Sequence, residues 1–259
     1  MSNASANLVA LNTIVRREIV RILRIWTQTL IPPAITMTLY FVIFGKLIGS
    51  RIGSIQHGYT YMQYLAPGLV MMSIITNSYG NISSSFFGAK FSRAVEEMLV
   101  SPMPNWVILT GYVAGAVVRG LSVGALVLGI ALFFTSLHVA HPLLTFASVL
   151  LGSVIFSLAG FVNAVYAKKF DDIALVPTFI LTPLTYLGGV FYSISMLGEP
   201  WQAISRINPI LYMVNAFRYG VLGISDVNVG VAFAVMLVFV LALGAFGLQL
   251  LKRGVGLRS

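Results

Sequence analysis

Residues 170–223 decide the fold, and they read FDDIALVPTFILTPLTYLGGVFYSISMLGEPWQAISRINPILYMVNAFRYGVLG. The stretch begins with two acidic residues and then stays apolar for one bilayer thickness, roughly 20 residues. Prolines and glycines interrupt this apolar run at Pro177, Pro183, Gly188 and Gly189. The stretch turns amphipathic around Trp201 and ends in a second apolar piece that is too short to cross a bilayer. This pattern is typical of a membrane segment with broken helices near a pathway, and a soluble core does not need it.

The overall composition also indicates an integral membrane protein. Of the 259 residues, 58% are hydrophobic and 9% are charged, whereas soluble domains carry about 25% charged residues. The net charge of +9 does not indicate nucleic acid as a partner, because the basic residues lie in short clusters between apolar spans. The sequence contains no cysteine, which excludes a disulfide framework, a thiol nucleophile and a cysteine-based metal site.

We expect an all-α fold with one membrane domain over residues 26–259, preceded by an amphipathic helix over residues 1–25. In that helix an apolar residue recurs every three or four positions, at Leu8, Leu11, Val15, Ile19, Ile22 and Trp26. Arginines lie beside this stripe, so the helix is expected in the interface of the anionic cytoplasmic leaflet. A solvated helical extension is the alternative. A signal peptide is not expected, because the basic residues are interleaved with apolar ones.

Six apolar segments have about the 20 residues that a membrane span requires: residues 26–47, 64–82, 107–134, 143–166, 173–192 and 229–251. Most basic residues fall on the side that holds both termini, so this side is expected to be cytoplasmic. If residues 210–224 also crossed, the basic C-terminal tail would lie outside. We therefore expect residues 193–224 to enter from the outer side and return as short re-entrant helices.

The longest cytoplasmic connection, residues 86–106, reads FFGAKFSRAVEEMLVSPMPNW. One helical face carries Phe91, Val95, Met98 and Leu99, and other faces carry Arg93, Glu96 and Glu97. A short amphipathic helix of this kind can dock into the groove of a partner protein. Lying on the lipid surface is the alternative, but anionic lipid repels two adjacent acids. The sequence has no G-x-x-x-x-G-K-[ST] phosphate loop, so any ATP must be bound by another chain.

Arg119 lies inside the third expected span, where an ionisable residue costs about 2.5–3.5 kcal/mol on insertion scales. It is a candidate functional residue, and snorkelling to the cytoplasmic interface is an equally good alternative. Two pairs of glycines on the same span, Gly111 with Gly115 and Gly120 with Gly124, predict close packing against other helices.

In the outer segment, Asn208 and Pro209 are expected to end a short helix. Arg218 lies in the non-spanning apolar piece, where it needs water, a lipid phosphate or a carboxylate such as Glu199 or Asp226. We favour an ion pair that holds the returning segment. The histidines have no carboxylate cluster beside them, and no G-x-S-x-G motif is present. We therefore expect no catalytic residue, no metal site and no cofactor bound by this chain.

Two long blocks resemble the permease subunits of type 2 ATP-binding-cassette (ABC-2) exporters. The first is YMQYLAPGLVMMSIITNSYGN (61–81) with FFGAKFSRAVEEMLVSPMP (86–104), and the second is FDDIALVPTFILTPLTYLGGVFYS (170–193) with the following NP…FRYG…LG pattern. The resemblance covers essentially the whole chain. It implies a six-span subunit of the bacterial inner membrane that pairs as a homodimer and binds ATPase subunits, which hold ATP and Mg.

The resemblance also assigns roles to the segments. Residues 1–25 would be the connecting helix, and the segment between the fifth and sixth spans would close the exit. The coupling helix that seats in the ATPase would contain Arg93, Glu96, Glu97, Met98 and Leu99.

We therefore expect an exporter that moves an amphipathic or hydrophobic substrate out of the cytoplasm by alternating access. Polar pathway or gate candidates are Asn77, Asn81, Arg119, Thr178, Thr182, Thr185, Asn208 and Arg218. Helix–helix hydrogen bonding is the alternative role for the asparagines and threonines of the spans. Export of polysaccharide or lipo-oligosaccharide is an alternative function. An intramembrane lipid-modifying enzyme would need a cluster of acids or histidines in the membrane, and none is visible.

Overall fold

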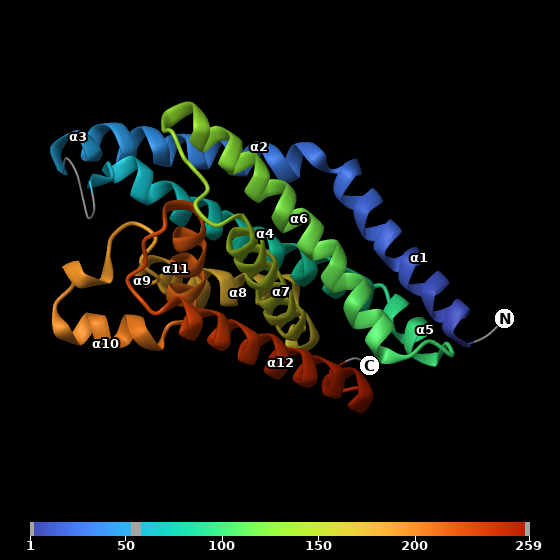
Figure 1. Ribbon diagram of the computed structural model, residues 1–259. Coiled ribbons are helices and arrows are strands. Elements are labelled where there is room, and N and C mark those ends of the chain that lie inside the picture. The colour runs from blue at the N-terminus through green and yellow to red at the C-terminus, as the bar shows by residue number, and fades with distance from the viewer. Residues whose placement is uncertain (1–2, 53–57, 257–259) are drawn as a thin grey trace.

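The computed structural model describes residues 3–52 and 58–256, and the long elements in these ranges are all helices (Figure 1). The expected all-α fold is therefore confirmed. His57 and Arg258 lie outside the described residues. The helices are α1 (Asn3–Arg24), α2 (Trp26–Tyr40), η1 (Phe41–Ile48), α3 (Gly49–Ile52), α4 (Tyr61–Phe91), α5 (Ala94–Val100), α6 (Asn105–Phe134), α7 (Pro142–Tyr166), α8 (Phe170–Val176), η3 (Pro177–Leu181), α9 (Thr182–Leu187), η4 (Ile194–Met196), α10 (Glu199–Ile207), α11 (Pro209–Leu222) and α12 (Val229–Arg253).

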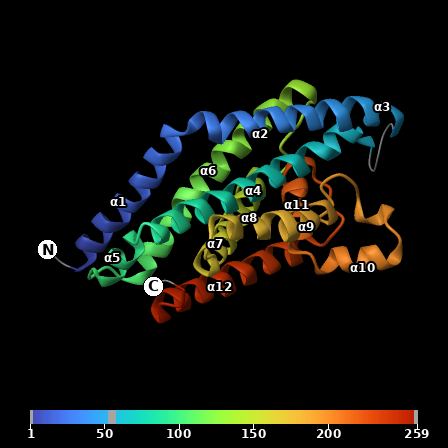
Figure 2. The same cartoon turned by 180° about the vertical axis from the view of Figure 1, so that it is seen from behind.

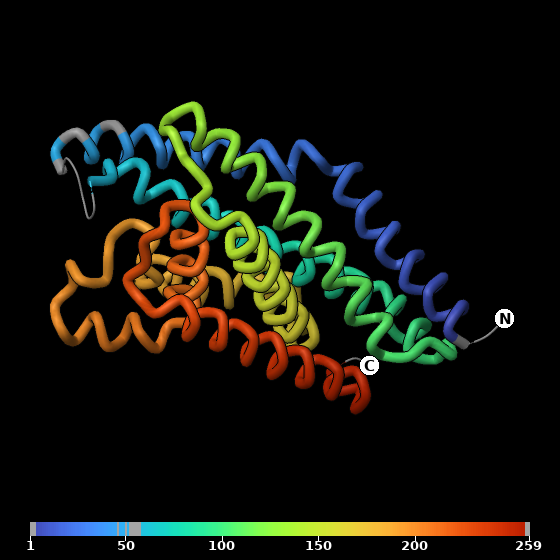
Figure 3. The backbone as a smooth tube through the Cα atoms, viewed as in Figure 1, coloured from blue at the N-terminus to red at the C-terminus, as the bar shows by residue number. Residues whose placement is uncertain are grey.

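The bundle has two distinct ends, which we call the α5 end and the α10 end. The start of α1 and the end of α12 lie at the α5 end, and α3 lies with α10 at the other end (Figures 1 and 2). The tube in Figure 3 follows the chain from α9 out to α10 and back into the bundle as α11. The segment between the last two expected spans therefore leaves and re-enters the bundle at one end.

Five helical segments in the described part of the chain are long and apolar enough to cross a membrane: Trp26–Gly45, Asn105–Phe134, Pro142–Tyr166, Phe170–Leu187 and Val229–Arg253. They correspond to five of the six expected spans. The other expected span lies in α4, which has 31 residues but is more polar. Because α6, α7 and α11 pack around α4, most of its side chains contact protein. A helix in this central position does not need a lipid-compatible surface.

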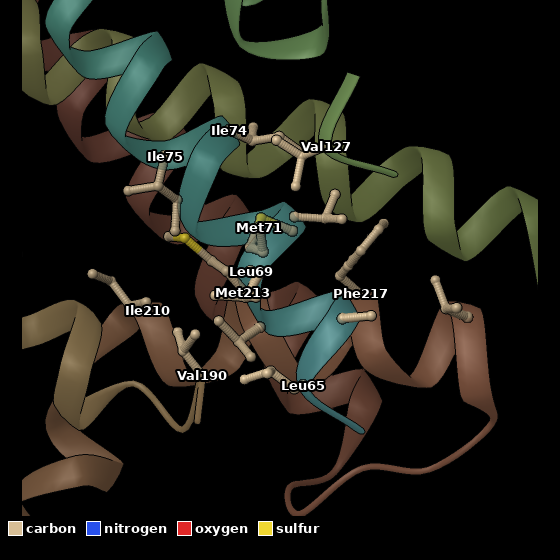
Figure 4. Packing of buried hydrophobic residues seen from close by; sticks show 14 of the residues in the cluster. Leu65, Leu69, Met71, Ile74, Ile75, Val127, Val190, Ile210, Met213 and Phe217 are labelled. Carbon is tan, nitrogen blue, oxygen red and sulfur yellow. The ribbon is translucent and has the colours of Figure 1, made fainter. Parts of the chain in front are cut away.

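The largest core cluster is built around α4 (Figure 4). Leu65 and Leu69 of α4 lie near Val190 and Met213, which come from the segment after α9 and from α11. Further along α4, Ile74 meets Val127 of α6. These contacts place α4 at the centre of the fold.

The fifth expected span ends earlier than the sequence suggested. Its helix stops at Leu187 instead of Tyr192, because Gly189 adopts a left-handed backbone with φ of 70°. Within the span, η3 has the wider turns of a π-helix. The carbonyl of Pro177 accepts hydrogen bonds from both the backbone N–H and the hydroxyl of Thr182.

Helix α11 is short and almost completely buried. Its 14 residues rise about 21 Å, which is less than the roughly 30 Å core of a bilayer. The break at Asn208–Pro209 is confirmed: α10 ends at Ile207, and Asn208 caps α11 by accepting the N–H of Ile210 at 3.0 Å. The same side chain donates to the carbonyl of Leu184, which ties the start of α11 to α9.

The predicted close packing at the glycines of α6 is confirmed. Gly111 and Gly115 lie against Ile14 and Glu18 of α1, and Gly124 lies against Ile74 of α4. A Cβ atom added to Gly111 would stand 2.6 Å from the Ile14 side chain. The glycines therefore let the backbone of α6 approach both α1 and α4 closely.

Candidate functional site

Helix α1 buries a carboxylate among polar partners, which we call the Glu18 cluster: Glu18, Arg17, Arg21, Asn81 and Ser85. The Glu18 side chain is 2% exposed, and its Oε2 lies 3.0 Å from Nη2 of Arg21. The Ser85 hydroxyl donates to the same oxygen at 2.7 Å. Arg21 also donates to Oδ1 of Asn81 at 2.7 Å, and Arg17 lies 3.6 Å from Oε1. The cluster therefore joins α1 to α4 by charged hydrogen bonds.

A second contact of the same cluster reaches α6. Arg17 donates to the hydroxyl of Tyr112 at 2.5 Å, and its guanidinium carbon lies 5.2 Å from the centroid of that ring. Helix α1 thus contacts both α4 and α6 through polar side chains, although it was expected to contact lipid with its apolar stripe.

Sequence reasoning missed Glu18. The structure buries Ile14, Glu18 and Ile22, whereas Leu8 and Trp26 of the expected stripe are more than half exposed. One signal was available, since Glu18 is the first acidic residue of the chain and the next is Glu96. An isolated acid among arginines indicates an internal ion pair more readily than a lipid-facing helix.

Next to the Glu18 cluster lies a hollow of about 320 Å³, which we call the α2–α4 groove. Helix α2 packs mainly against α6, and this leaves open space between α2 and α4. The groove is lined by Gln28, Pro32, Pro33, Thr36, Met37, Tyr40, Met72, Thr76, Asn77 and Arg119.

Arg119 reaches this groove from α6. Its Nε atom is buried without a hydrogen-bond partner. The residues that the structure describes offer no carboxylate within ion-pair distance and no hydrogen-bond acceptor to the rest of the guanidinium. The groove therefore presents a positive charge that the subunit does not neutralise.

The structure brings together only part of the pathway candidates. Asn77 and Arg119 share the groove, and Asn81 lies one helical turn further along α4, bound to Arg21. Thr178 and Thr182 are exposed on the η3–α9 segment, whereas Thr185 is buried and donates to the carbonyl of Leu181. None of these three threonines lines the groove that holds Asn77 and Arg119.

The expected ion pair of Arg218 is wrong. Its guanidinium lies 3.9 Å from the centroid of the Tyr64 ring, and its Nη2 donates to the carbonyl of Gly189 at 2.7 Å. The Tyr64 hydroxyl in turn donates to Asp226 at 3.1 Å. Arg218 is therefore stabilised by a cation–π contact and one hydrogen bond, while its Nε and Nη1 are buried without a hydrogen-bond partner. Glu199 is exposed on α10.

Helix α5 is the short helix that was expected within residues 86–106. It begins after Arg93, which has a left-handed backbone with φ of 62°. Val95 is fully buried, and Met98 and Leu99 pack partly against the bundle. The residues left open to a partner on this helix and its flanks include Phe91, Arg93, Glu97 and Val100, all exposed.

A hollow of about 540 Å³ adjoins α5 at the ends of α4, α7 and α12. Phe91 forms one wall, and its ring centroid lies 5.1 Å from that of Phe170. Glu96 and Lys168 also line the hollow. The α5 end therefore offers a recess with aromatic and charged walls beside the short helix.

Comparison with known proteins gives a consistent result. Residues 9–222 match the model of the family described as ABC-2 type transporter. The chain is 58% identical over 251 residues to the inner membrane transport permease YadH of Escherichia coli (strain K12), covering 97% of this chain and 98% of that protein. It is 22% identical over 216 residues to nodulation protein J of Rhizobium leguminosarum bv. viciae, covering 83% of each chain.

The matched residues contain most of the features described above and end before Asp226 and α12. They include the Glu18 cluster, the α2–α4 groove, α5 and α11.

Proposed function

Because this chain belongs to the ABC-2 type transporter family, we propose that it is the permease half of an exporter that moves an amphipathic or hydrophobic substrate out of the cytoplasm. Family membership makes it a transport permease of the membrane, a non-enzymatic subunit that works with a partner ATPase. Export, the substrate class and the direction of the chain in the membrane belong to the proposal.

The observation that carries the proposal is the placement of α5 between the two longest helices. Helices α4 and α6 have 31 and 30 residues, so each rises about 45 Å. The hydrocarbon core is only about 30 Å thick, so both helices can extend beyond it. Val95 anchors α5 in the bundle. A partner that pushes on α5 therefore moves α4 and α6 together, and these helices form two walls of the α2–α4 groove.

In the proposed cycle, the ATPase subunits bind ATP and Mg and close. Their motion reaches α4 and α6 through α5, and the groove changes its access from one side of the membrane to the other. Nucleotide must interact differently with the two states, because otherwise it shifts no equilibrium. The segment with α10 and α11 would close the outer exit.

Two copies of the chain would form the full pathway. The η3 segment presents Phe179 and Ile180 to the outside with 72% and 53% of their surface exposed, and Thr178 and Thr182 lie exposed beside them. An apolar surface with a few polar side chains suits a pathway between two copies better than a surface against lipid alone. We therefore propose a homodimer with the substrate path on its axis.

Charge reversal on α5 tests the proposed coupling. The double substitution Glu96→Lys with Glu97→Lys is expected to weaken binding of the partner ATPase at least about tenfold, because it places like charges where the partner should be complementary. Co-purification of the ATPase and its permease-stimulated ATP hydrolysis measure the effect. Glu199→Lys, on the exposed start of α10, is the matched control and should leave both unchanged. Unchanged binding and hydrolysis in the double variant would contradict the docking role of α5.

The orientation can be tested with single cysteines, since the sequence contains none. Ala203 is exposed on α10, and Ser92 is exposed beside α5. A membrane-impermeant maleimide added to intact spheroplasts should label Ala203→Cys and should label Ser92→Cys only after the inner membrane is permeabilised. The reverse pattern would put the termini outside and refute the proposed topology.

A further inference from the structure

We propose that the α2–α4 groove binds the acidic headgroup of an amphiphile from the cytoplasmic leaflet, with Arg119 as its counter-ion. The ligand class is a phosphate or carboxylate group joined to an apolar body. That such a ligand is exported, and that its leaflet is the cytoplasmic one, rest on the proposed function and orientation, whereas the binding site rests on the groove itself.

The first argument is the missing partner of Arg119. Two other arginines of the bundle have an internal group that stabilises the guanidinium. Arg21 has Glu18, and Arg218 has the Tyr64 ring and the Gly189 carbonyl, although its Nε and Nη1 are buried without a hydrogen-bond partner. For Arg119 the described residues provide no such group, and its Nε is buried without a partner. A guanidinium in that position is completed by an anion, and its fork of donors matches phosphate or carboxylate oxygens.

The second argument is the depth of Arg119 in the bundle. It lies 14 residues after Asn105, so it stands about 21 Å from the start of α6 along the helix axis. A bilayer core of about 30 Å that ends near Phe134 leaves about 15 Å of α6 beyond the core at the α5 end. Arg119 then lies about 6 Å inside the boundary on that side. This is within reach of the headgroups of the cytoplasmic leaflet.

The third argument is the division of the groove into polar and apolar walls. Gln28, Thr76 and Asn77 can bind headgroup oxygens beside Arg119, whereas Pro32, Pro33, Met37 and Met72 can contact a hydrocarbon chain. A purely polar solute would leave the apolar wall unused, and a neutral hydrocarbon would leave Arg119 unpaired. The lining thus fits a molecule with one acidic end and one apolar end.

The approach to the groove is also positively charged. A second hollow on α1 is lined by Arg16, Arg17, Arg21 and Arg24. Arg21 belongs both to this hollow and to the Glu18 cluster. Such a basic surface attracts anionic headgroups. An acidic amphiphile that moves along α1 in the membrane interface therefore meets Arg119 next.

Binding of two probes that share a dodecyl hydrocarbon chain and differ in their headgroup tests the proposal. The complex of permease and ATPase in maltoside micelles is titrated with dodecyl phosphate and with dodecyl phosphocholine. The wild-type complex should bind dodecyl phosphate at least tenfold more tightly, and Arg119→Leu should abolish the preference. Arg119→Lys should keep part of it, because it keeps the charge but loses the guanidinium fork. Arg253→Leu, an exposed arginine at the end of α12, is the matched control and should keep the preference.

A second variant tests the groove without changing its charge. Thr76→Phe should fill the space beside Arg119 and weaken dodecyl phosphate binding, while thermal unfolding of the complex confirms that it stays folded. The proposal is overturned if the two probes bind equally to the wild type, or if Arg119→Leu retains the preference.

Two readouts identify the source of the natural ligand. If dodecyl phosphate stimulates ATP hydrolysis, the site takes exported molecules; if it binds without stimulation and phosphatidylglycerol displaces it, the site holds an acidic membrane lipid. Both results support the acidic amphiphile. A complex whose hydrolysis depends on α5 but that shows no phosphate preference would overturn the site and leave the proposed function standing.

Discussion

Replacement of Glu18 by alanine is expected to lower the free energy of unfolding by about 3 kcal/mol, the low end of the range for breaking a buried ion pair. The carboxylate is almost fully buried, and without it Ser85 and Arg21 lose their shared acceptor. We expect the low end because 30% of the Arg21 side chain and 47% of the Arg17 side chain are exposed, so water can partly replace Glu18.

Chemical unfolding of the purified permease in detergent measures this loss. The control is Glu199→Ala, which removes an exposed carboxylate at the start of α10 and should change stability by less than about 1 kcal/mol. Equal effects of the two substitutions would mean that the Glu18 cluster does not hold α1 to α4.

The substitution Gly68→Val should lower the free energy of unfolding by about 3 kcal/mol, the upper part of the range for overpacking. The loss should be concentrated at the α10 end of the bundle. A Cβ atom on Gly68 would collide with the carbonyl oxygen of Val190 and lie 3.0 Å from its Cα. Backbone atoms cannot rotate away, so the segment after α9 must move off α4. Thermal unfolding and protease sensitivity of that segment report the change.

The same substitution at Gly80 is the matched control, because this glycine lies on the same helix and has open space around it. Gly80→Val should have little effect, or stabilise α4 slightly, since glycine is a poor helix former. Similar losses at both positions would show that valine disturbs α4 itself and would refute the close contact with Val190.

Much of the fold could be predicted from local patterns. Long apolar runs predicted α6, α7 and α12, with helix ends within a few residues of those observed. The glycine pairs of α6 correctly indicated close helix contacts. The Asn208–Pro209 break was also local, because proline cannot continue the preceding helix. These features depend on residues that are near one another in sequence.

The remaining features depend on contacts between distant residues. Tyr64 and Arg218 are separated by most of the chain, so no pattern around Arg218 reveals the aromatic ring that covers it. Glu18 and Ser85 meet for the same reason only in the folded bundle. Helix α4 contacts mainly protein side chains, so its sequence can be moderately polar. For this reason its hydropathy is a weak signal of a membrane span. In the candidate site, Arg119 was found from its charge alone, while the shape of the groove required the fold.

The burial of Arg218 makes the seating of α11 depend on the rest of the bundle. A guanidinium in an apolar environment is costly until it finds partners, and its partners are Tyr64 on α4 and the carbonyl of Gly189. Both partners lie in segments that precede α11 in the chain, so the cost of burying Arg218 is offset only when α4 and the segment after α9 are in place. The stable seating of this short helix therefore depends on the correct placement of segments that are distant from it in sequence.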